Sequence, residues 1–242
     1  MTISAMTWNQ SLFLWLNHAC AALPDWIWAS LTITGHTSMV FALFGAFLLP
    51  GFKRPTIITA LFATAIVGGI VSTALKESFK IMRPPAVLAP EQFHLIGHKL
   101  ELVSFPSGHT LTAFAVAALL IFGLSLRGWR LLGVLALACA IGLSRVAVGA
   151  HWPLDVAGGA ALGFACGWLG GLAGKSIHRQ AWADSRLYGF IQIAIILLVS
   201  ASLFATQMGY SDALIWQITT GVIGMTFSTY SLLLLLKFSN TR

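Results

Sequence analysis

The sequence predicts an all-α fold: a polytopic membrane bundle of about seven transmembrane helices, with an interfacial helix before them at the N-terminus. Hydrophobic residues make up 57% of the 242 residues and charged residues only 9%, which is outside the composition of soluble globular domains. Several apolar stretches also reach the roughly 20 residues that a helix needs to cross a bilayer, without a charge in the middle. We therefore expect spans at about residues 26–49, 55–75, 108–126, 130–149, 153–174, 187–207 and 213–236.

The first element is an apolar stretch over residues 8–23, which is too short to cross a bilayer comfortably. Gln10, Asn17 and His18 interrupt it, so we expect an interfacial amphipathic helix rather than a span. The sequence has no Ser/Gly/Pro-rich linker and no long polar tract. Residues 1–242 are therefore predicted to form a single domain.

Two of the spans carry small or polar residues whose simplest role is packing. His36 lies among hydroxyl residues of the first span and is expected to be an internally hydrogen-bonded packing residue. The fifth span has a glycine at every fourth position, which allows a neighbouring helix to approach closely. These glycines are Gly159, Gly163, Gly167 and Gly171.

The basic residues predict the orientation in the membrane rather than a nucleic-acid surface, although the net charge is +7. Short basic loops stay in the cytoplasm, so the face with more Lys and Arg should be cytoplasmic. One face receives Lys53, Arg54, Arg127, Arg130, Lys175, Arg179, Arg186, Lys237 and Arg242. The other, predicted extracytoplasmic, receives Lys76, Lys80, Arg83, Lys99 and Arg145.

Three clusters of reactive residues fall on this second face. The longest segment between spans, about residues 77–106, leads into them and is rich in proline, so we expect an ordered loop that is either a lid or a connector. The first cluster ends the second span, the next begins the third span, and the last joins the fourth span to the fifth. In that order they contain Lys76 and Arg83, then Ser107, Gly108 and His109, then Arg145, His151 and Asp155.

The Ser107-Gly108 pair fits the start of a helix. A serine N-cap leaves backbone N–H groups pointing outward, and a helix N-terminus binds anions readily. Glycine lets a ligand approach the backbone. Residues of these types also begin helices for purely structural reasons, so the pair alone does not establish a site.

His151 and Asp155 flank Pro153, which suits the first position of a helix. A carboxylate bonded to one ring nitrogen fixes the tautomer and leaves the other nitrogen a lone pair, as a nucleophile or base requires. The same two side chains can instead cap the helix and satisfy each other. From this pair alone, both interpretations stay open.

The cations Lys76, Arg83 and Arg145 can each serve as an interfacial anchor. Together with a helix N-terminus and two histidines on one face, they make a site for a multiply charged anion. Phosphate fits best, because arginine offers planar, bidentate donors to its oxygens.

The residues then resemble a known signature: K-x6-R-P at Lys76, Arg83 and Pro84, P-S-G-H at 106–109, and S-R-x5-H-x3-D at 144–155. It is similar to the three-part signature of the type-2 phosphatidic acid phosphatase superfamily, which also includes vanadium haloperoxidases. The resemblance covers about residues 25–174. The N-terminal stretch and two C-terminal spans, about 187–236, lie outside it.

The resemblance implies a metal-independent phosphatase that works through a phosphohistidine, without a cofactor or an obligatory protein partner. It implies that His151 attacks phosphorus, that Asp155 holds and polarises His151, and that His109 protonates the leaving oxygen. Phosphate oxygens would be bound by Lys76, Arg83, Ser107, Gly108 and Arg145, and Ser144 would have a supporting role.

A phosphate site at the ends of apolar helices suits a lipid substrate. We expect an enzyme of the bacterial cytoplasmic (inner) membrane whose site faces the periplasm or exterior. Undecaprenyl diphosphate, phosphatidylglycerophosphate, phosphatidic acid and lipid A phosphates all remain candidates. A lipid phosphotransferase would use the same phosphoenzyme. So many membrane spans argue against a haloperoxidase. A transporter is disfavoured because the charged residues gather at one face rather than near the midplane, where transporter sites usually lie.

Overall fold

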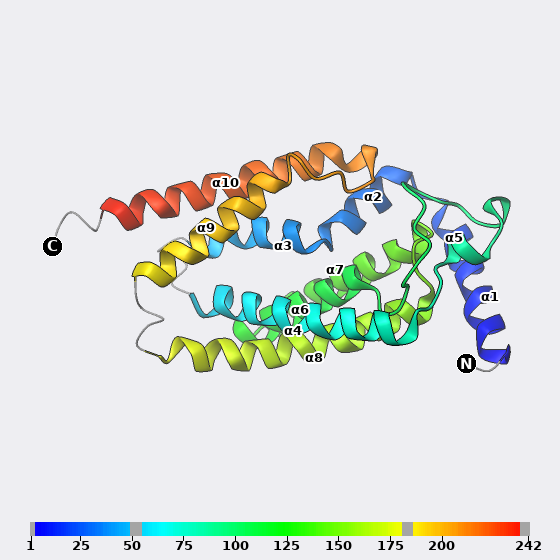
Figure 1. Ribbon diagram of the computed structural model, residues 1–242, viewed down its shortest axis with the longest axis horizontal. Coiled ribbons are helices and arrows are strands. Elements are labelled where there is room, and N and C mark those ends of the chain that lie inside the picture. The colour runs from blue at the N-terminus through cyan, green and yellow to red at the C-terminus, as the bar shows by residue number, and fades with distance from the viewer. Residues whose placement is uncertain (1–2, 49–54, 181–185, 238–242) are drawn as a thin grey trace.

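The computed structural model describes residues 3–48, 55–180 and 186–237, and all regular secondary structure in these residues is helical. The helices form two layers, with a further helix across one end (Figure 1). One layer contains α2 (Asp25–Thr34), α3 (Thr37–Phe44), α9 (Arg186–Ser202) and α10 (Leu214–Lys237). The other contains α4 (Pro55–Phe79), α6 (Gly108–Gly123), α7 (Trp129–Ala147) and α8 (Pro153–His178). The short elements are α5 (Pro84–Val87) and 3-10 turns at Gly45–Leu48, Pro90–Gln92 and Ser211–Ala213.

Each predicted span contains helix, which confirms the all-α class, but a count of seven spans is not confirmed. Within the described residues, four stretches are long and apolar enough to cross a membrane: Thr56–Val87, Trp129–Ala147, Pro153–His178 and Ser211–Lys237. The predicted span over 26–49 is instead two helices bent by 71°, which make a fifth if they are taken as one. The helices α6 and α9 are apolar but shorter than 18 residues.

The layer of α4, α6 and α8 is packed through glycine, as the spacing in the fifth span predicts. A Cβ on Gly163 would lie 2.2 Å from the Leu111 carbonyl oxygen, and one on Gly167 would lie 2.2 Å from that of Ala115. Only glycine allows backbones to come this close. Gly171 does not share this role, since its nearest neighbour would be a Leu119 methyl at 3.7 Å. The contact brings the N-termini of α6 and α8 together at one end of the bundle.

Helix α1 (Ile3–Cys20) runs across that same end of the bundle (Figure 1). The buried Asn17 side chain fastens it there: its amide donates to the carbonyls of Val146 and Ala147, both at 3.0 Å, and to that of His94 at 2.9 Å. Trp15, on the other side of the helix, is exposed. This crosswise position suits the interfacial helix that the sequence predicts, because exposed tryptophans favour the membrane interface.

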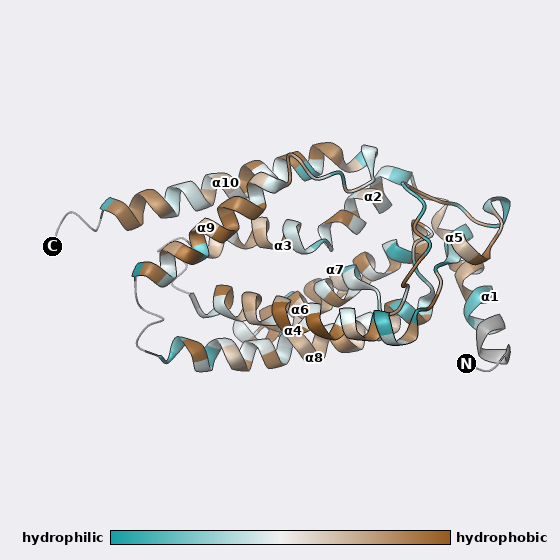
Figure 2. Ribbon diagram, viewed as in Figure 1, coloured by the Kyte–Doolittle hydropathy of each residue, from teal (hydrophilic) through white to brown (hydrophobic). Residues whose placement is uncertain are grey.

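Apolar residues run along the helices, and the hydrophilic residues gather toward the two ends (Figure 2). The helices α4 and α7 finish at the α1 end with Lys76 and Arg145, whereas α8 and α10 finish at the far end with Lys175 and Lys237. These four basic residues therefore lie at opposite ends as the sequence predicts, and which end faces the cytoplasm stays a prediction. Lys53, Arg54 and Arg242 of that prediction lie outside the described residues.

Candidate active site

The α1 end of the bundle brings the first and third sequence clusters into contact. Arg83 Nη1 lies 3.1 Å from His151 Nε2 and donates to the Ala150 carbonyl at 3.2 Å. Both side chains are buried, at 8% and 1% exposure. A guanidinium can only donate, so His151 Nε2 accepts this bond and the ring proton is on Nδ1. The nitrogen with the lone pair therefore faces the cation.

A tight turn after α7 places His151 beside the last turn of that helix. The backbone N–H groups of Ala150 and His151 both donate to the Arg145 carbonyl, at 3.0 and 3.2 Å. Gly149 has a φ of +77°, and a Cβ there would lie 2.8 Å from the Phe93 ring. Glycine satisfies both constraints at once. Arg145 and His151 are thus fixed relative to each other by backbone hydrogen bonds.

The surroundings of His151 favour its neutral form. Burial, and then the positive charges of Arg83, Arg145, His109 and Lys76, keep the pKa of His151 well below its usual value. A neutral imidazole has a free lone pair, which a nucleophile requires. Arg83 contacts the ring directly, and the other three groups act on it from further away.

Asp155 reaches His151 through a serine. Its Oδ2 lies 3.5 Å from His151 Nδ1, which is too long for a strong hydrogen bond. Ser104 Oγ donates to Asp155 Oδ2 at 2.5 Å and lies 3.4 Å from His151 Nδ1, and the Trp152 N–H donates to the same carboxylate oxygen at 2.8 Å. The sequence predicts a direct bond between the carboxylate and the imidazole. In the structure, the Ser104 hydroxyl lies between Asp155 Oδ2 and His151 Nδ1 and links them instead.

The loop before α6 holds Arg83. The Arg83 N–H donates to the Glu101 carbonyl at 2.9 Å, and its Nε donates to the Leu102 carbonyl at 2.8 Å. The Ser104 N–H in turn donates to the Ile81 carbonyl at 2.7 Å. The segments around residues 81–83 and 101–104 are thus bonded side by side. This part of the predicted ordered loop fixes both the cation and the serine against His151.

Arg145 is a buried cation with neutral partners. Its side chain is 1% exposed, and Nη1 donates to Tyr210 Oη at 3.1 Å and to Thr32 Oγ1. Its Nε is buried without a hydrogen-bond partner in the described part of the chain. Neither Arg145 nor Arg83 forms an ion pair with a described carboxylate. In the described part of the chain, two buried guanidinium groups therefore share one region without a direct ion pair, although the charge of Asp155 acts on Arg83 from beyond 4 Å.

Ser107 occupies the N-cap position of α6, as the sequence predicts, but its side chain makes no capping bond. Instead its Oγ accepts a hydrogen bond from Thr110 Oγ1 at 2.9 Å, and its N–H donates to the Asp155 carbonyl at 3.0 Å. The following N–H groups of Gly108 and His109 belong to the first turn of the helix. Such groups lack partners within a helix and favour an anion.

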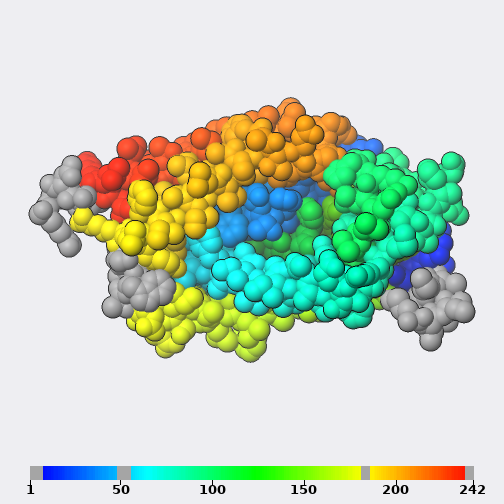
Figure 3. Space-filling view, in the orientation of Figure 1, coloured from blue at the N-terminus to red at the C-terminus, as the bar shows by residue number. Residues whose placement is uncertain are grey.

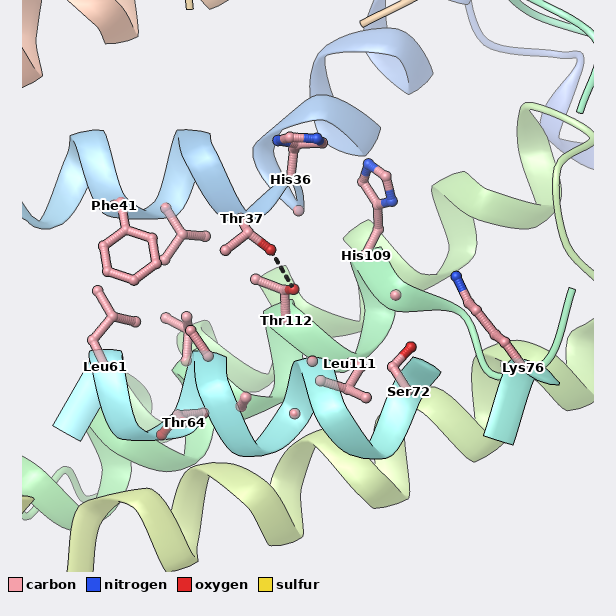
Figure 4. Close-up of a pocket in the computed structure, with 18 residues that line it drawn as sticks. His36, Thr37, Phe41, Leu61, Thr64, Ser72, Lys76, His109, Leu111 and Thr112 are labelled. Atoms are coloured by element: carbon pink, nitrogen blue, oxygen red, sulfur yellow. Dashed lines mark hydrogen bonds between the residues drawn. The ribbon is translucent and has the colours of Figure 1, made fainter. Parts of the chain in front are cut away.

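Lys76, Gly108 and His109 line a cavity of about 290 Å³ between α3, α4 and α6. Figure 4 shows the His109 ring and the Lys76 amino group at one end of this cavity, with Phe41 and Leu61 at the other. His36 lines it as well. Its Nδ1 accepts a hydrogen bond from the Ser38 N–H at 3.3 Å, so the internal bond expected for His36 is present, but the ring also borders the cavity.

Three residues of this region were not singled out from the sequence: Ser104, Thr32 and Tyr210. Ser104 stands two residues before Pro106, and its nearness to the second cluster is the one signal that the chain offers. Thr32 and Tyr210 are 113 and 65 residues away from Arg145, so only the fold reveals their contacts. In the described ranges, no group of three His, Cys, Asp or Glu side chains is placed to hold a metal ion.

Comparison with known proteins adds independent information. The family model described as PAP2 superfamily matches residues 56–179, just over half of the chain. The bacitracin transport permease protein BcrC of Bacillus licheniformis is 36% identical over 102 residues, which are 42% of this chain and 46% of that protein. Lipid A 1-phosphatase of Rhizobium etli is 37% identical over 120 residues, which are 45% of each.

Lipid A 1-phosphatase of Porphyromonas gingivalis is 35% identical over 117 residues, which are 48% of this chain and 23% of that protein. The chain thus spans less than half the length of these curated relatives. Among solved structures, Aquifex aeolicus LpxE superposes with a TM-score of 0.60 and 27% identity, over 70% of this chain and 98% of that one. With the three-part signature and a family model that matches more than half of its residues, this chain belongs to the PAP2 superfamily.

Proposed function

We propose that this protein is a membrane lipid phosphatase that hydrolyses a phosphate monoester or a diphosphate lipid through a phosphohistidine on His151. The observation that carries the proposal is the pair of buried guanidinium groups, Arg83 and Arg145, which lie beside a buried neutral imidazole and form no direct ion pair with a described carboxylate. Three relatives in two genera are named lipid A 1-phosphatase, which supports a lipid phosphate as substrate.

Buried charges are costly unless a counter-charge accompanies them. Two unpaired guanidinium groups next to the α6 N-terminus therefore favour a bound anion. Phosphate suits them because arginine presents paired N–H donors to its oxygens. We assign the non-bridging oxygens to Arg83, Arg145, Lys76, Ser107 and the Gly108 N–H.

In the first step, His151 Nε2 attacks phosphorus and the Nε2–P bond forms as the bond to the leaving oxygen breaks. Protonated His109 gives its proton to that oxygen, which departs as the lipid product. General-acid help of this kind contributes about 10²- to 10⁴-fold. Asp155, through Ser104, stabilises the Nδ1–H side of the ring as positive charge develops.

In the second step, water attacks the phosphohistidine and passes a proton to His109. The Nε2–P bond breaks, inorganic phosphate leaves, and His151 regains its lone pair. Splitting one hydrolysis into two displacements is the advantage of a covalent nucleophile. The cations act in both steps, because charge on the phosphoryl oxygens must be stabilised each time.

The cavity supports a lipid as the leaving group. From Lys76 and His109 it continues between α3 and α4 to the apolar side chains of Phe41 and Leu61. Figure 3 shows the surface hollowed between the blue α3 and the cyan α4, on the side of the bundle. An opening there would face the hydrocarbon and admit a tail while the phosphate stays at the bundle end. Undecaprenyl diphosphate, phosphatidylglycerophosphate and phosphatidic acid are the substrates that we favour.

We place the protein in the bacterial cytoplasmic membrane with this site toward the periplasm or exterior. Basic residues at the far ends of α8 and α10 support that orientation through the positive-inside rule. Accessibility of single cysteines to a membrane-impermeant reagent tests it. The Lys99→Cys variant should react in intact cells, and the Arg127→Cys variant should react only after the membrane is opened.

Phosphate release by the purified protein from a panel of lipid phosphates, with a metal chelator present, tests the proposed function. We expect phosphate release from at least one lipid and no loss of activity with the chelator. His151→Ala should release no phosphate. Release that needs an added acceptor lipid would instead support a phosphotransferase. Because one relative is named a transport permease, flux into vesicles without phosphate release is the outcome that would favour a transporter.

A further inference from the structure

The cavity next to His109 has a polar band that the proposed catalytic residues leave unused. Ser72 from α4 lies near the end of the cavity that His109 and Lys76 line (Figure 4). His36 and Thr37 from the start of α3, with Thr112 from α6, lie between that end and the apolar end at Phe41 and Leu61. Thr37 Oγ1 and Thr112 Oγ1 lie 3.4 Å apart across it (Figure 4). The apolar part begins only beyond this band. A ligand in the cavity therefore meets donors before it meets hydrocarbon.

His36 offers a donor of defined direction. It is the N-cap residue of α3, and its Nδ1 accepts from the Ser38 N–H. When one ring nitrogen of a neutral histidine accepts, the other carries the proton. His36 Nε2 is thus an N–H donor. Its ring lies 5.6 Å from the His109 ring, measured between centroids.

Gly35 allows this pairing of two histidines from distant segments. A Cβ on Gly35 would lie 2.6 Å from an Ile141 methyl and 3.1 Å from both the Cβ and the carbonyl oxygen of His109. Without a side chain, the bend between α2 and α3 packs directly against α6. His36 is therefore placed beside His109 by backbone packing and not by a flexible side chain.

The location of this band relative to the reaction decides what it contacts. The cavity lining includes Lys76, Gly108 and His109 but not Arg83, Arg145 or His151. Of the two histidines proposed to act in catalysis, His109 and not His151 therefore lines the cavity. If His109 protonates the leaving oxygen, the first atoms of the leaving group lie in the polar band.

We propose that His36 Nε2–H binds a second phosphate, which remains on the lipid after hydrolysis, and that it selects lipid diphosphates over lipid monophosphates. Thr37 and Thr112 assist it, and Lys76 lies between the two phosphates. This inference rests on the proposed function and names the substrate class for it. A simple alcohol leaving group has one oxygen to bind, whereas the band offers an imidazole, hydroxyls and an ammonium. The two threonine hydroxyls already lie within reach of each other, so the imidazole N–H and the Lys76 ammonium are the donors that a second phosphate would satisfy.

The decisive comparison uses a prenyl diphosphate and the prenyl monophosphate of the same tail, with His36→Asn and His36→Gln. Asparagine caps helices well and can still accept from the Ser38 N–H, but its amide is too short to replace Nε2. Glutamine places an amide donor near the Nε2 position. We expect His36→Asn to lower kcat/KM for the diphosphate about 10- to 100-fold, the range for a hydrogen bond to a charged group. Monophosphate turnover should stay unchanged, and His36→Gln should recover most of the loss.

A binding measurement separates this inference from the proposed function. In the His151→Ala background, adding His36→Asn should weaken prenyl diphosphate binding by a similar factor and leave the binding of inorganic phosphate unchanged. Equal losses for both lipids, or equal diphosphate affinities with and without His36, would overturn the assignment even if the phosphatase is real. Conversely, a selective loss of diphosphate binding would uphold it even if hydrolysis proceeds without His151.

Discussion

Arg83 donates from Nη1 to Nε2 of His151 across 3.1 Å, and both side chains are buried. The cation that would bind the phosphate therefore touches the nitrogen that would attack it. The contact also fixes the tautomer, since a guanidinium has no lone pair to offer the ring. Phosphate binding must exchange this hydrogen bond for bonds to phosphate oxygens, which would free Nε2 at the moment when phosphorus arrives.

Arg83→Lys should lower kcat about 10²- to 10³-fold, the loss typical of removing one donor to a transition-state charge. Lysine keeps the charge but loses the planar donors that reach His151 and the Leu102 carbonyl together. Steady-state phosphate release gives the value. Lys99→Ala is the control, because Lys99 pairs with Glu101 at the surface. Activity of Arg83→Lys within a factor of three of the parent protein would argue against a direct role.

Ser104→Ala should lower kcat about 10- to 100-fold with little change in KM, because Ser104 is fully buried and links Asp155 to the imidazole. A lower kcat with an unchanged KM would identify Ser104 as a residue that positions the imidazole rather than one that binds substrate. Ser78→Ala is a matched control, since that exposed hydroxyl donates to the Ala74 carbonyl of its own helix. Full activity of Ser104→Ala would mean that Asp155 acts on His151 without the serine.

The acid limb of kcat/KM should lie below the usual titration range of histidine. Burial and the nearby cations lower the pKa of His151 in the folded protein, so the ring stays neutral and nucleophilic as the pH falls below about 6.5. Arg83→Gln removes one of these cations and should move the limb of the residual activity toward higher pH. A limb that stays at the same pH would indicate that another group controls it.

The same pKa shift affects stability. Below about pH 6.5, the unfolded chain binds a proton at His151 before the folded protein does. The free energy of unfolding should therefore decrease as the pH falls from that value toward the lower pKa of the folded state. His151→Gln should show a weaker dependence in this window, measured by denaturation in detergent across the pH range.

Tyr210→Phe should lower kcat/KM about tenfold, because Tyr210 Oη orients the Arg145 guanidinium from the loop before α10. Competitive inhibition by inorganic phosphate should weaken together with kcat/KM in Tyr210→Phe. A purely structural role of Tyr210 would leave this inhibition unchanged. Tyr230→Phe, at an exposed tyrosine of α10, is the control. Unchanged phosphate inhibition in Tyr210→Phe would remove Tyr210 from the site.

Much of this arrangement could be predicted from the sequence, because local features determine it. Apolar length indicated the helices, and the glycine spacing indicated that a neighbouring helix approaches α8 closely, which the structure identifies as α6. The three clusters are each contiguous, so their residues stand out in a chain with few charges. The bend at Gly35–His36 was not foreseen, since both halves of that span are apolar enough to be one helix.

The features that could not be predicted depend on long-range packing. Ser104 lies between Asp155 and His151 only because residues 101–104 bond beside residues 81–83. Thr32 and Tyr210 reach Arg145 from elements on either side of the matched family region. His36 and His109 become neighbours through the contact of Gly35 with α6. No spacing along the chain encodes these distances.

The most direct test is to trap the phosphoenzyme. Purified protein mixed with a phosphate-labelled lipid substrate and quenched rapidly in alkali should carry a label that is stable in base and lost in acid, as expected for a phosphorus–nitrogen bond. Peptide mapping should place that label on His151, and His109→Ala should lengthen its lifetime because water activation is impaired. A label on another residue, or undiminished lipid hydrolysis by His151→Ala, would contradict the proposed mechanism.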